Sequence, residues 1–289
     1  MRKVATAAMF AALSATALGM TAGQPAAAAP SVNMEAVVKA AMWDPYKADQ
    51  SITPGSGESV KAVEQALAAK NLLDKKQVDG HFGTSTVTAY QKYQKSLGHS
   101  GLAASGLPGK GSLTELGKGR YTVTAPISVG SKTSLDGKTV NKRTADMIAA
   151  AEKKAGVKFT ITQGSYNAGG VGASGGTHDG GGAVDISVNN ISNKTAAVKA
   201  LREVGFAAWH RTPSQGNWAE HIHGIAISDT DMSPQAQAQA GDYFKGLNGL
   251  ASHAKDDGPK VKKVTWEEFL FFFFIYILCL MCLFFFYLS

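Results

Sequence analysis

Residues 178–185 read HDGGGAVD, and this stretch ends inside an apolar run, 183–188, that predicts a buried strand. Successive side chains of a strand point to opposite faces, so Asp185 lies on the face opposite its two apolar neighbours. A carboxylate on so apolar a strand needs a partner if it is buried. The three glycines before the strand let the backbone fold tightly, and this brings His178 back toward Asp185.

A second stretch, EHIHG at 220–224, opens another strand-like run, 221–227. His221 and His223 are two positions apart, so they project from the same face of a strand. Glu220 lies three positions before His223, within reach of the same centre. A His–Asp pair alone is usually a structural hydrogen bond, and His-x-His alone is a weak signal. Together they favour two imidazoles and a carboxylate on one metal with an open water position, which is typical of catalytic zinc sites.

The C-terminal half around these stretches alternates between strand-like and helix-like runs. Strand-like runs lie at 121–129, 157–162, 183–188, 206–209 and 221–227, and helix-like runs at 143–155, 194–204 and 234–247. A glycine-rich run at 169–183 leads into a strand and not into a helix, which excludes a phosphate-binding loop of the nucleotide type. The pattern predicts an α+β domain with an antiparallel sheet at 120–250.

Residues 57–119 follow a different pattern, with apolar residues at helical spacing. A first helix is expected from Glu58, a second after VDGHFGTST (78–86), and a third, short one at 112–117. Three short helices in roughly 60 residues make a small bundle, about the least that buries a core without disulfides or metals. The α+β domain is therefore expected to follow a separate three-helix domain.

Three segments of this bundle carry a recognisable pattern: DGHFGTST (79–86), AYQKYQ (89–94) and GKGSLTELG (109–117). They resemble the peptidoglycan-binding domain found at the ends of bacterial wall hydrolases. Its pattern runs from a helix through a D-G-x-F-G-x-x-T turn and A-[VY]-x-x-[FY]-Q to a glycine-rich loop and a last helix. The resemblance implies that this domain anchors the protein to peptidoglycan, and no nucleic-acid partner is expected.

HDGGGAVD and EHIH also resemble the zinc D-Ala-D-Ala peptidases, which include carboxypeptidases, vancomycin-resistance dipeptidases and phage endopeptidases. That group shares its metal site with lysostaphin-type enzymes and hedgehog domains. Its first motif, S-x-H-x-x-G-x-A-x-D, is matched at 178–185, although Gly176 stands in place of the serine. Its second motif places a Glu or Asp three residues before a ligand histidine. The resemblance covers 139–227.

The resemblance implies a role for each residue of the two motifs. His178, Asp185 and His223 are expected to be ligands of one Zn²⁺. Glu220 is expected to be the general base, and His221 to stabilise the oxyanion or orient the substrate.

The chain departs from this family where relatives carry an SGYR-like stretch. Residues 163–167 read QGSYN and contain no arginine. In relatives that arginine is thought to grip the substrate near its terminal carboxylate, a bidentate contact that amides do not easily replace. Its absence leaves two options open: cleavage inside a cross-link, or replacement by Arg211 from another loop. Gln163, Tyr166 and Arg211 are therefore the candidate substrate-binding residues.

The expected function is that of a secreted zinc metallopeptidase that hydrolyses D-Ala-containing stem peptides or cross-links of peptidoglycan, as a carboxypeptidase or an endopeptidase. The alternative is a catalytically inactive peptidoglycan-binding module that keeps its zinc site.

The two ends of the chain are expected to lie outside these domains. Residues 1–29 are typical of a secretory signal peptide, with two basic residues, an apolar stretch and small residues before the cleavage site, so the protein is expected to be secreted and wall-associated. Residues 30–56 are expected to be an N-terminal segment and linker, and 251–268 a polar linker. The hydrophobic segment 269–289 is either a membrane anchor or a gene-model artefact, because lysines precede it and nothing basic follows.

Cysteine usage and charge add limits to the function. Both cysteines, Cys279 and Cys282, lie in the hydrophobic segment. This excludes a disulfide framework, a cysteine nucleophile and cysteine metal ligands for the first 268 residues. The net charge of +7 is compatible with binding to an anionic polymer and also with plain solubility. Net charge therefore does not discriminate between possible functions.

Overall fold

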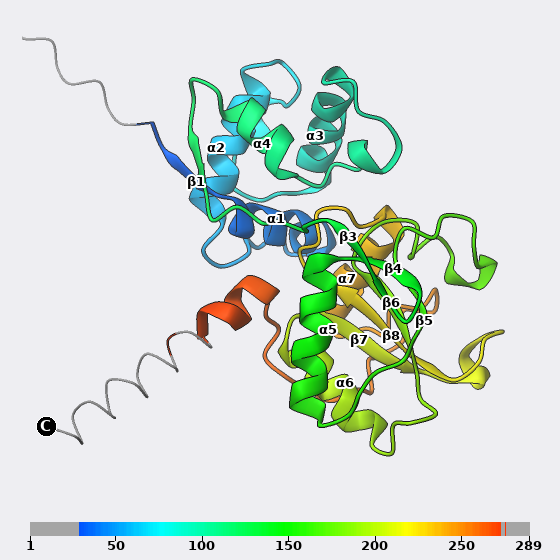
Figure 1. Cartoon of the computed structure of the whole chain (residues 1–289). Helices are drawn as coiled ribbons and strands as arrows, with labels where there is room; N and C mark the ends of the chain where they lie inside the picture. Colours follow the sequence, from blue (N-terminus) through cyan, green and yellow to red (C-terminus); the bar gives the residue numbers. More distant parts are fainter. Residues whose placement is uncertain (1–28, 273–274, 276–289) are drawn as a thin grey trace, which may run out of the picture.

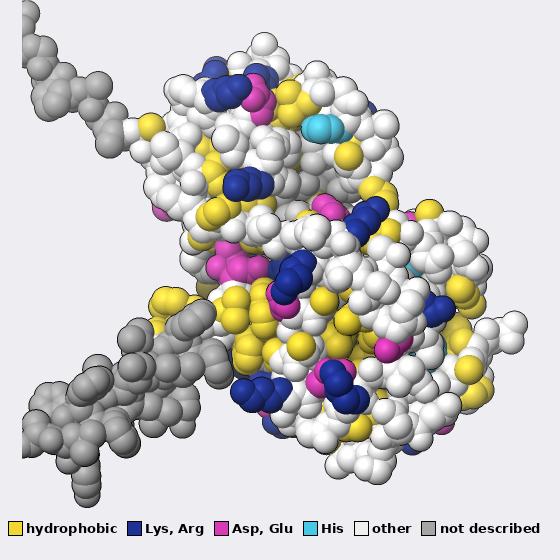
Figure 2. Space-filling view, viewed as in Figure 1, with side chains coloured by type: hydrophobic (Ala, Val, Ile, Leu, Met, Phe, Trp, Pro, Cys, Tyr) yellow, Lys and Arg dark blue, Asp and Glu magenta, His cyan; other side chains and the backbone are white. Residues whose placement is uncertain are grey.

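The structure is a computed structural model that describes residues 29–272 and 275. It has a mixed α+β fold with two lobes joined at a narrower waist (Figures 1 and 2). Residues 1–28 of the expected signal peptide and most of the expected hydrophobic segment lie outside the described residues. Among the residues that are described, no helix is long and apolar enough to cross a membrane.

The N-terminal lobe is a bundle of three helices, α2 (Gly57–Ala68), α3 (Thr84–Ser96) and α4 (Lys110–Gly117). Its core contains the apolar residues at helical spacing together with Phe82, which is fully buried. The turn before Phe82 needs a glycine, because Gly80 has φ +88° and a Cβ there would lie 2.9 Å from the carbonyl oxygen of Gly57.

The C-terminal lobe contains a four-stranded antiparallel sheet with the order β5-β6-β8-β7. The strands are β5 (Ile161–Gln163), β6 (Ala183–Ser187), β7 (Phe206–Arg211) and β8 (His221–Ala226). Helices α5 (Lys142–Ala155) and α6 (Lys194–Glu203) cover one face and share a core with it. Helix α7 (Pro234–Lys245) packs against the other face of the sheet, which also carries His221 and His223.

The segment before the bundle is part of the folded core. Strand β1 (Ser31–Asn33) pairs in parallel with β2 (Thr122–Thr124), and α1 (Met34–Trp43) follows with Asn33 as its N-cap. Helix α1 is buried along most of its length between the two lobes (Figure 1). The N-terminal segment and linker expected at 30–56 contain this packed helix, and their apolar residues join the two lobes in one hydrophobic cluster.

The segment at 251–268, expected to be a polar linker, also packs against the body of the protein. Two of its charged residues have partners there: Asp256 is buried and accepts a hydrogen bond from Arg202 at 2.9 Å, and Glu267 pairs with Arg143 at 2.8 Å. These pairs fix a stretch whose composition alone suggested a linker. A helix begins at Trp266, and the side chains of Phe271 and Phe272 on it are exposed.

Two details of the strands differ from the sequence-based expectation. The run at 121–129 forms only the three-residue strand β2, and it pairs with β1 outside the main sheet. A hairpin of β3 (Lys132–Leu135) and β4 (Lys138–Asn141) was not expected, because its strands are short and mostly polar. The Asp-Gly pair at its turn, with φ +49° and +73°, was the available signal.

Short 3₁₀ turns lie at Asp44–Tyr46, Lys75–Gln77, Gly101–Ala104, Gly172–Ser174 and Pro213–Gln215.

Candidate metal centre

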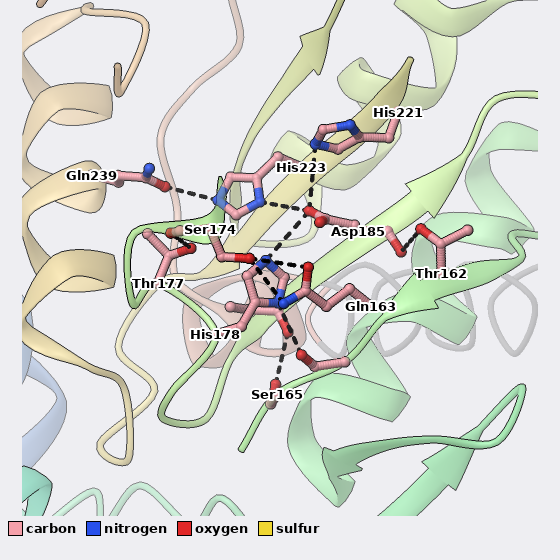
Figure 3. Close-up of polar contacts among 12 residues, drawn as sticks. Thr162, Gln163, Ser165, Ser174, Thr177, His178, Asp185, His221, His223 and Gln239 are labelled. Atoms are coloured by element: carbon pink, nitrogen blue, oxygen red, sulfur yellow. Dashed lines mark hydrogen bonds and ion pairs between the residues drawn. The ribbon is translucent and has the colours of Figure 1, made fainter. Parts of the chain in front are cut away.

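The register of the central strands brings the expected ligands together. On β6 and β8, Asp185 lies directly opposite His223. The Asp185 Oδ1 atom is 2.7 Å from His223 Nδ1 and 3.4 Å from His178 Nε2 (Figure 3). One ligand atom from each of these three residues lies within 4.8 Å of the other two. His178, Asp185 and His223 therefore form a group that can bind a metal ion.

His178 reaches this group through the triglycine turn at 180–182. A Cβ on Gly180 would lie 2.3 Å from the carbonyl oxygen of Asp231, and Gly182 has φ +81°. The amide of Gly181 donates to the same Asp231 carbonyl at 2.8 Å. Because a side chain at these positions would push the turn off its neighbour, the glycines place the histidine as the sequence indicated.

The protons of two imidazoles are held on the outside of the group. His178 Nδ1 is 2.8 Å from the carbonyl oxygen of Gly164, and His221 Nδ1 is 2.7 Å from that of Ala219. A carbonyl oxygen only accepts, and a neutral imidazole has one N–H, so Nδ1 carries it in both residues. Their Nε2 lone pairs therefore face Asp185 Oδ1, at 3.4 Å from His178 and 3.7 Å from His221.

His223 has an oxygen on each side. Its Nε2 is 2.8 Å from Gln239 Oε1, and its Nδ1 is 2.7 Å from Asp185 Oδ1. Burial lowers the pKa of His223, which favours the neutral ring with a single proton for two oxygens. One of its nitrogens then faces an oxygen with no proton between them. A cation beside Asp185 resolves this conflict by taking the Nδ1 lone pair.

Asp185 supplies the negative charge of the group. Burial raises its pKa, but when the rings of His178 and His223 carry a proton toward it, their hydrogen bonds and charges hold the pKa of Asp185 well below its usual range. The carboxylate is therefore ionised at neutral pH. An anionic oxygen surrounded by imidazole nitrogens with outward protons is a donor set suited to a divalent cation.

Glu220, the expected general base, does not join this group. Its Oε1 atom is 2.7 Å from His210 Nε2 and 3.8 Å from Lys194 Nζ. His210 pairs with Ile222 across the sheet, so it belongs to the face opposite His221 and His223. The carboxylate is held at the rim of the groove described next.

Two hollows meet at the metal-binding group. A groove of about 680 Å³ runs past Asp185 and His221 between the β4–β5 region and the loop before β8, and Glu220 lies on its wall. A smaller pocket of about 90 Å³ adjoins it, next to His178, His223 and Arg211. A chain-like ligand can thus lie in the groove with one end at the small pocket.

The three expected substrate-binding residues differ in whether their polar atoms already have hydrogen-bond partners within the protein. Gln163 exchanges hydrogen bonds with the Ser174 hydroxyl at 2.9 and 3.1 Å, and the Tyr166 hydroxyl donates to Asp231 at 2.8 Å. Both side chains thus hold the walls of the groove. Arg211 Nη1 donates to the carbonyl of Asn248, whereas its buried Nη2 has no hydrogen-bond partner among the described residues. Burial lowers the pKa of Arg211 to about 10.

Sequence reasoning missed Gln239, which contacts His223 from α7. It belongs to the run QAQAQA, where three glutamines alternate with alanines and nothing marks one of them.

No protein-family model, no curated protein and no solved structure matches this chain. The donor set and its surroundings therefore carry the functional argument.

Proposed function

We propose that this protein is a zinc-dependent peptidase of peptidoglycan stem peptides, with a wall-binding bundle beside the hydrolytic domain. The observation that carries the proposal is the arrangement of imidazole nitrogens around Asp185. The Nδ1 atoms of His178 and His221 lie against backbone carbonyls, so each ring in its neutral form directs its Nε2 lone pair at the Asp185 carboxylate. Such a centre is unfavourable when empty and favourable around a cation.

Zinc is the best candidate among divalent cations. Two imidazoles and one carboxylate, with space for water and substrate, are the ligands of catalytic zinc sites, whereas Mg²⁺ and Ca²⁺ prefer oxygen ligands. Bound zinc would polarise a peptide carbonyl and make a water molecule more acidic. His178, Asp185 and His223 would hold it.

His221 is the proton acceptor that the geometry favours. Its Nδ1 proton is committed to the Ala219 carbonyl, so the free Nε2 lone pair faces the centre. In this orientation the neutral ring can accept a proton at Nε2. Before it has accepted one, it has no proton at Nε2 to donate to an oxyanion. After accepting a proton from water, it can pass that proton to the leaving amine. Glu220 remains the second candidate for this role, and it would first have to leave His210.

The groove supports an extended, amide-rich substrate. Its wall offers hydroxyl and amide side chains, including Thr139, Asn167 and Asn217, which suit the peptide groups and hydroxyls of a wall polymer. The bundle beside it retains the segments that resemble wall-binding domains. Arg211, whose Nη2 at the small pocket has no hydrogen-bond partner in the described part of the chain, is the candidate contact for a substrate carboxylate.

The test is incubation of the purified full-length protein with isolated peptidoglycan and defined muropeptides, with and without a chelator, followed by mass analysis of released fragments. We expect chelator-sensitive cleavage. H221Q should keep zinc and lose at least about 100-fold in turnover, as for loss of a general base. E220Q should lose less than H221Q. The reverse order would return the role of base to Glu220.

Zinc binding without cleavage of any muropeptide would contradict the proposal and favour the alternative, an inactive wall-binding module that keeps its metal site.

A further inference from the structure

We infer that Gln239 is a positioning residue for the metal centre: its side-chain oxygen holds the His223 proton on Nε2 and so frees Nδ1 to bind a cation. The inference rests on the metal site of the proposed function. Its geometric basis is the 2.8 Å separation between Gln239 Oε1 and His223 Nε2 on the side away from Asp185 (Figure 3).

The need for such a residue follows from the competing hydrogen bond. His223 Nδ1 is only 2.7 Å from the Asp185 carboxylate, a strong acceptor. A neutral His223 with no acceptor at Nε2 would place its proton on Nδ1 and close a His–Asp hydrogen bond. Metal binding would then have to move that proton to a buried nitrogen with no partner, which is costly. Gln239 removes this cost by providing an acceptor at Nε2.

The fold fixes Gln239 in this position through α7. The helix begins at Pro234, directly after its N-cap Ser233, and turns Ala236, Ala240 and Tyr243 into the hydrophobic core. Gln239 is three residues after Ala236, so it lies on the same side of the helix, toward the sheet.

The N-terminal segment in turn holds α7 against the sheet. Trp43 of α1 stacks on Phe244 with ring centroids 4.7 Å apart. The ring of Tyr46 lies so close to Gly241 that a Cβ there would be 2.3 Å from it. The segment that leads to the bundle thus supports the helix that supports His223, which gives the buried α1 a role at the metal centre.

The test compares Q239L, Q239E and the control Q237L in the full chain. Leucine removes the acceptor with little change in size, and glutamate keeps an acceptor but cannot donate. Gln237 lies on the same helix, and its amide contacts the Met232 carbonyl instead of a histidine. Zinc affinity is measured on metal-free protein by competition with a chromophoric chelator. The position of the His223 proton is read from ¹⁵N chemical shifts of the imidazole nitrogens.

We expect Q239L to weaken zinc binding by about 10- to 100-fold, the range typical of residues that orient metal ligands. Its His223 proton should shift toward Nδ1. Q239E and Q237L should bind zinc at least as tightly as the unmodified protein, within a factor of about 3, a free-energy difference that is small against the expected loss.

Two outcomes would overturn the inference. Equal zinc affinity and an unchanged His223 proton in Q239L would show that Gln239 does not position the ring. Equal losses in Q239L and Q239E would show that Gln239 donates a hydrogen bond to His223 instead of accepting one. If the unmodified protein binds no zinc, the proposed function fails, and the ¹⁵N shifts of metal-free protein still decide the role of Gln239.

Discussion

The bundle and the sheet both bury carboxylates, but the neighbours of these carboxylates are of opposite kinds. In the bundle, Glu64 accepts hydrogen bonds from two backbone amides and the Thr86 hydroxyl, at 2.8 to 3.1 Å. In the sheet, Asp185 faces imidazole nitrogens, two of which have their protons directed away from it. A buried carboxylate surrounded by donors is complete and structural, whereas one surrounded by lone pairs is completed by a cation.

Asp44 belongs to the structural kind and sits where the N-terminal segment meets the bundle. Its carboxylate is fully buried and accepts from the amide and hydroxyl of Thr53, from the amide of Phe82, and from Lys47 at 2.8 Å. The comparison therefore makes separate predictions for Asp185, Asp44 and Glu64.

The largest effect is expected for D185N. The amide removes the negative charge and offers N–H groups to the inward lone pairs, so zinc affinity should fall by more than about 100-fold, and turnover with it. The metal-free variant should unfold at the same temperature as metal-free wild type or higher, because its donors satisfy the imidazoles. Chelator competition and thermal unfolding measure the two effects. A metal-free D185N that is clearly less stable would place Asp185 with the structural carboxylates.

The opposite result is expected for D44N. The substitution leaves the buried Lys47 without its charge partner and places an N–H₂ among donors, so the protein should lose about 3–5 kcal/mol of unfolding free energy. Zinc affinity of the folded protein should be nearly unchanged. Urea unfolding of the full chain tests this, and a loss under about 1 kcal/mol would mean that the donors around Asp44 find other partners.

The raised pKa of Glu64 predicts that the unfolding free energy of the protein depends on pH. Burial raises its pKa from 4.5 to about 7, so the folded protein binds a proton that the unfolded chain has lost between those pH values. Stability should therefore fall as pH rises through this window, by about 3 kcal/mol in total. Glutamine at 64 keeps acceptors for the two amides and stays neutral, so E64Q should lose this part of the pH dependence. Denaturation at pH 5 and pH 8 compares the two proteins, and parallel pH profiles would refute the assignment.

The smallest effect is expected at an exposed carboxylate. Glu203 pairs with Lys154 at 3.0 Å and also with Lys199 on the surface of α6. Solvent screens such pairs, so E203Q should change the unfolding free energy by less than about 1 kcal/mol and leave zinc binding unaltered. Urea unfolding checks this, and a larger loss would show that ion pairing without burial already stabilises this fold.

The sequence predicted much of the framework for local reasons. Helical spacing located the bundle helices within a few residues, since α2 begins at Gly57 and α3 at Thr84. Two-residue alternation placed His221 and His223 on one face of their strand and Asp185 opposite its apolar neighbours, because that periodicity is a property of any strand.

What the sequence did not predict depends on contacts between distant segments. The burial of α1 requires partners in both lobes, and the contact of Gln239 with His223 requires α7 to cross the sheet at one position. The displacement of Glu220 toward His210 likewise depends on the register between β7 and β8, which spacing along the chain does not encode.

The central claim is that the nitrogens around Asp185 hold a divalent cation. Its most direct test is native mass spectrometry of the full-length protein equilibrated with zinc, for wild type and D185N side by side. The expected result is one zinc per wild-type chain and none on D185N. A wild-type chain that carries no zinc at saturating concentration, or a D185N chain that retains it, would contradict the claim.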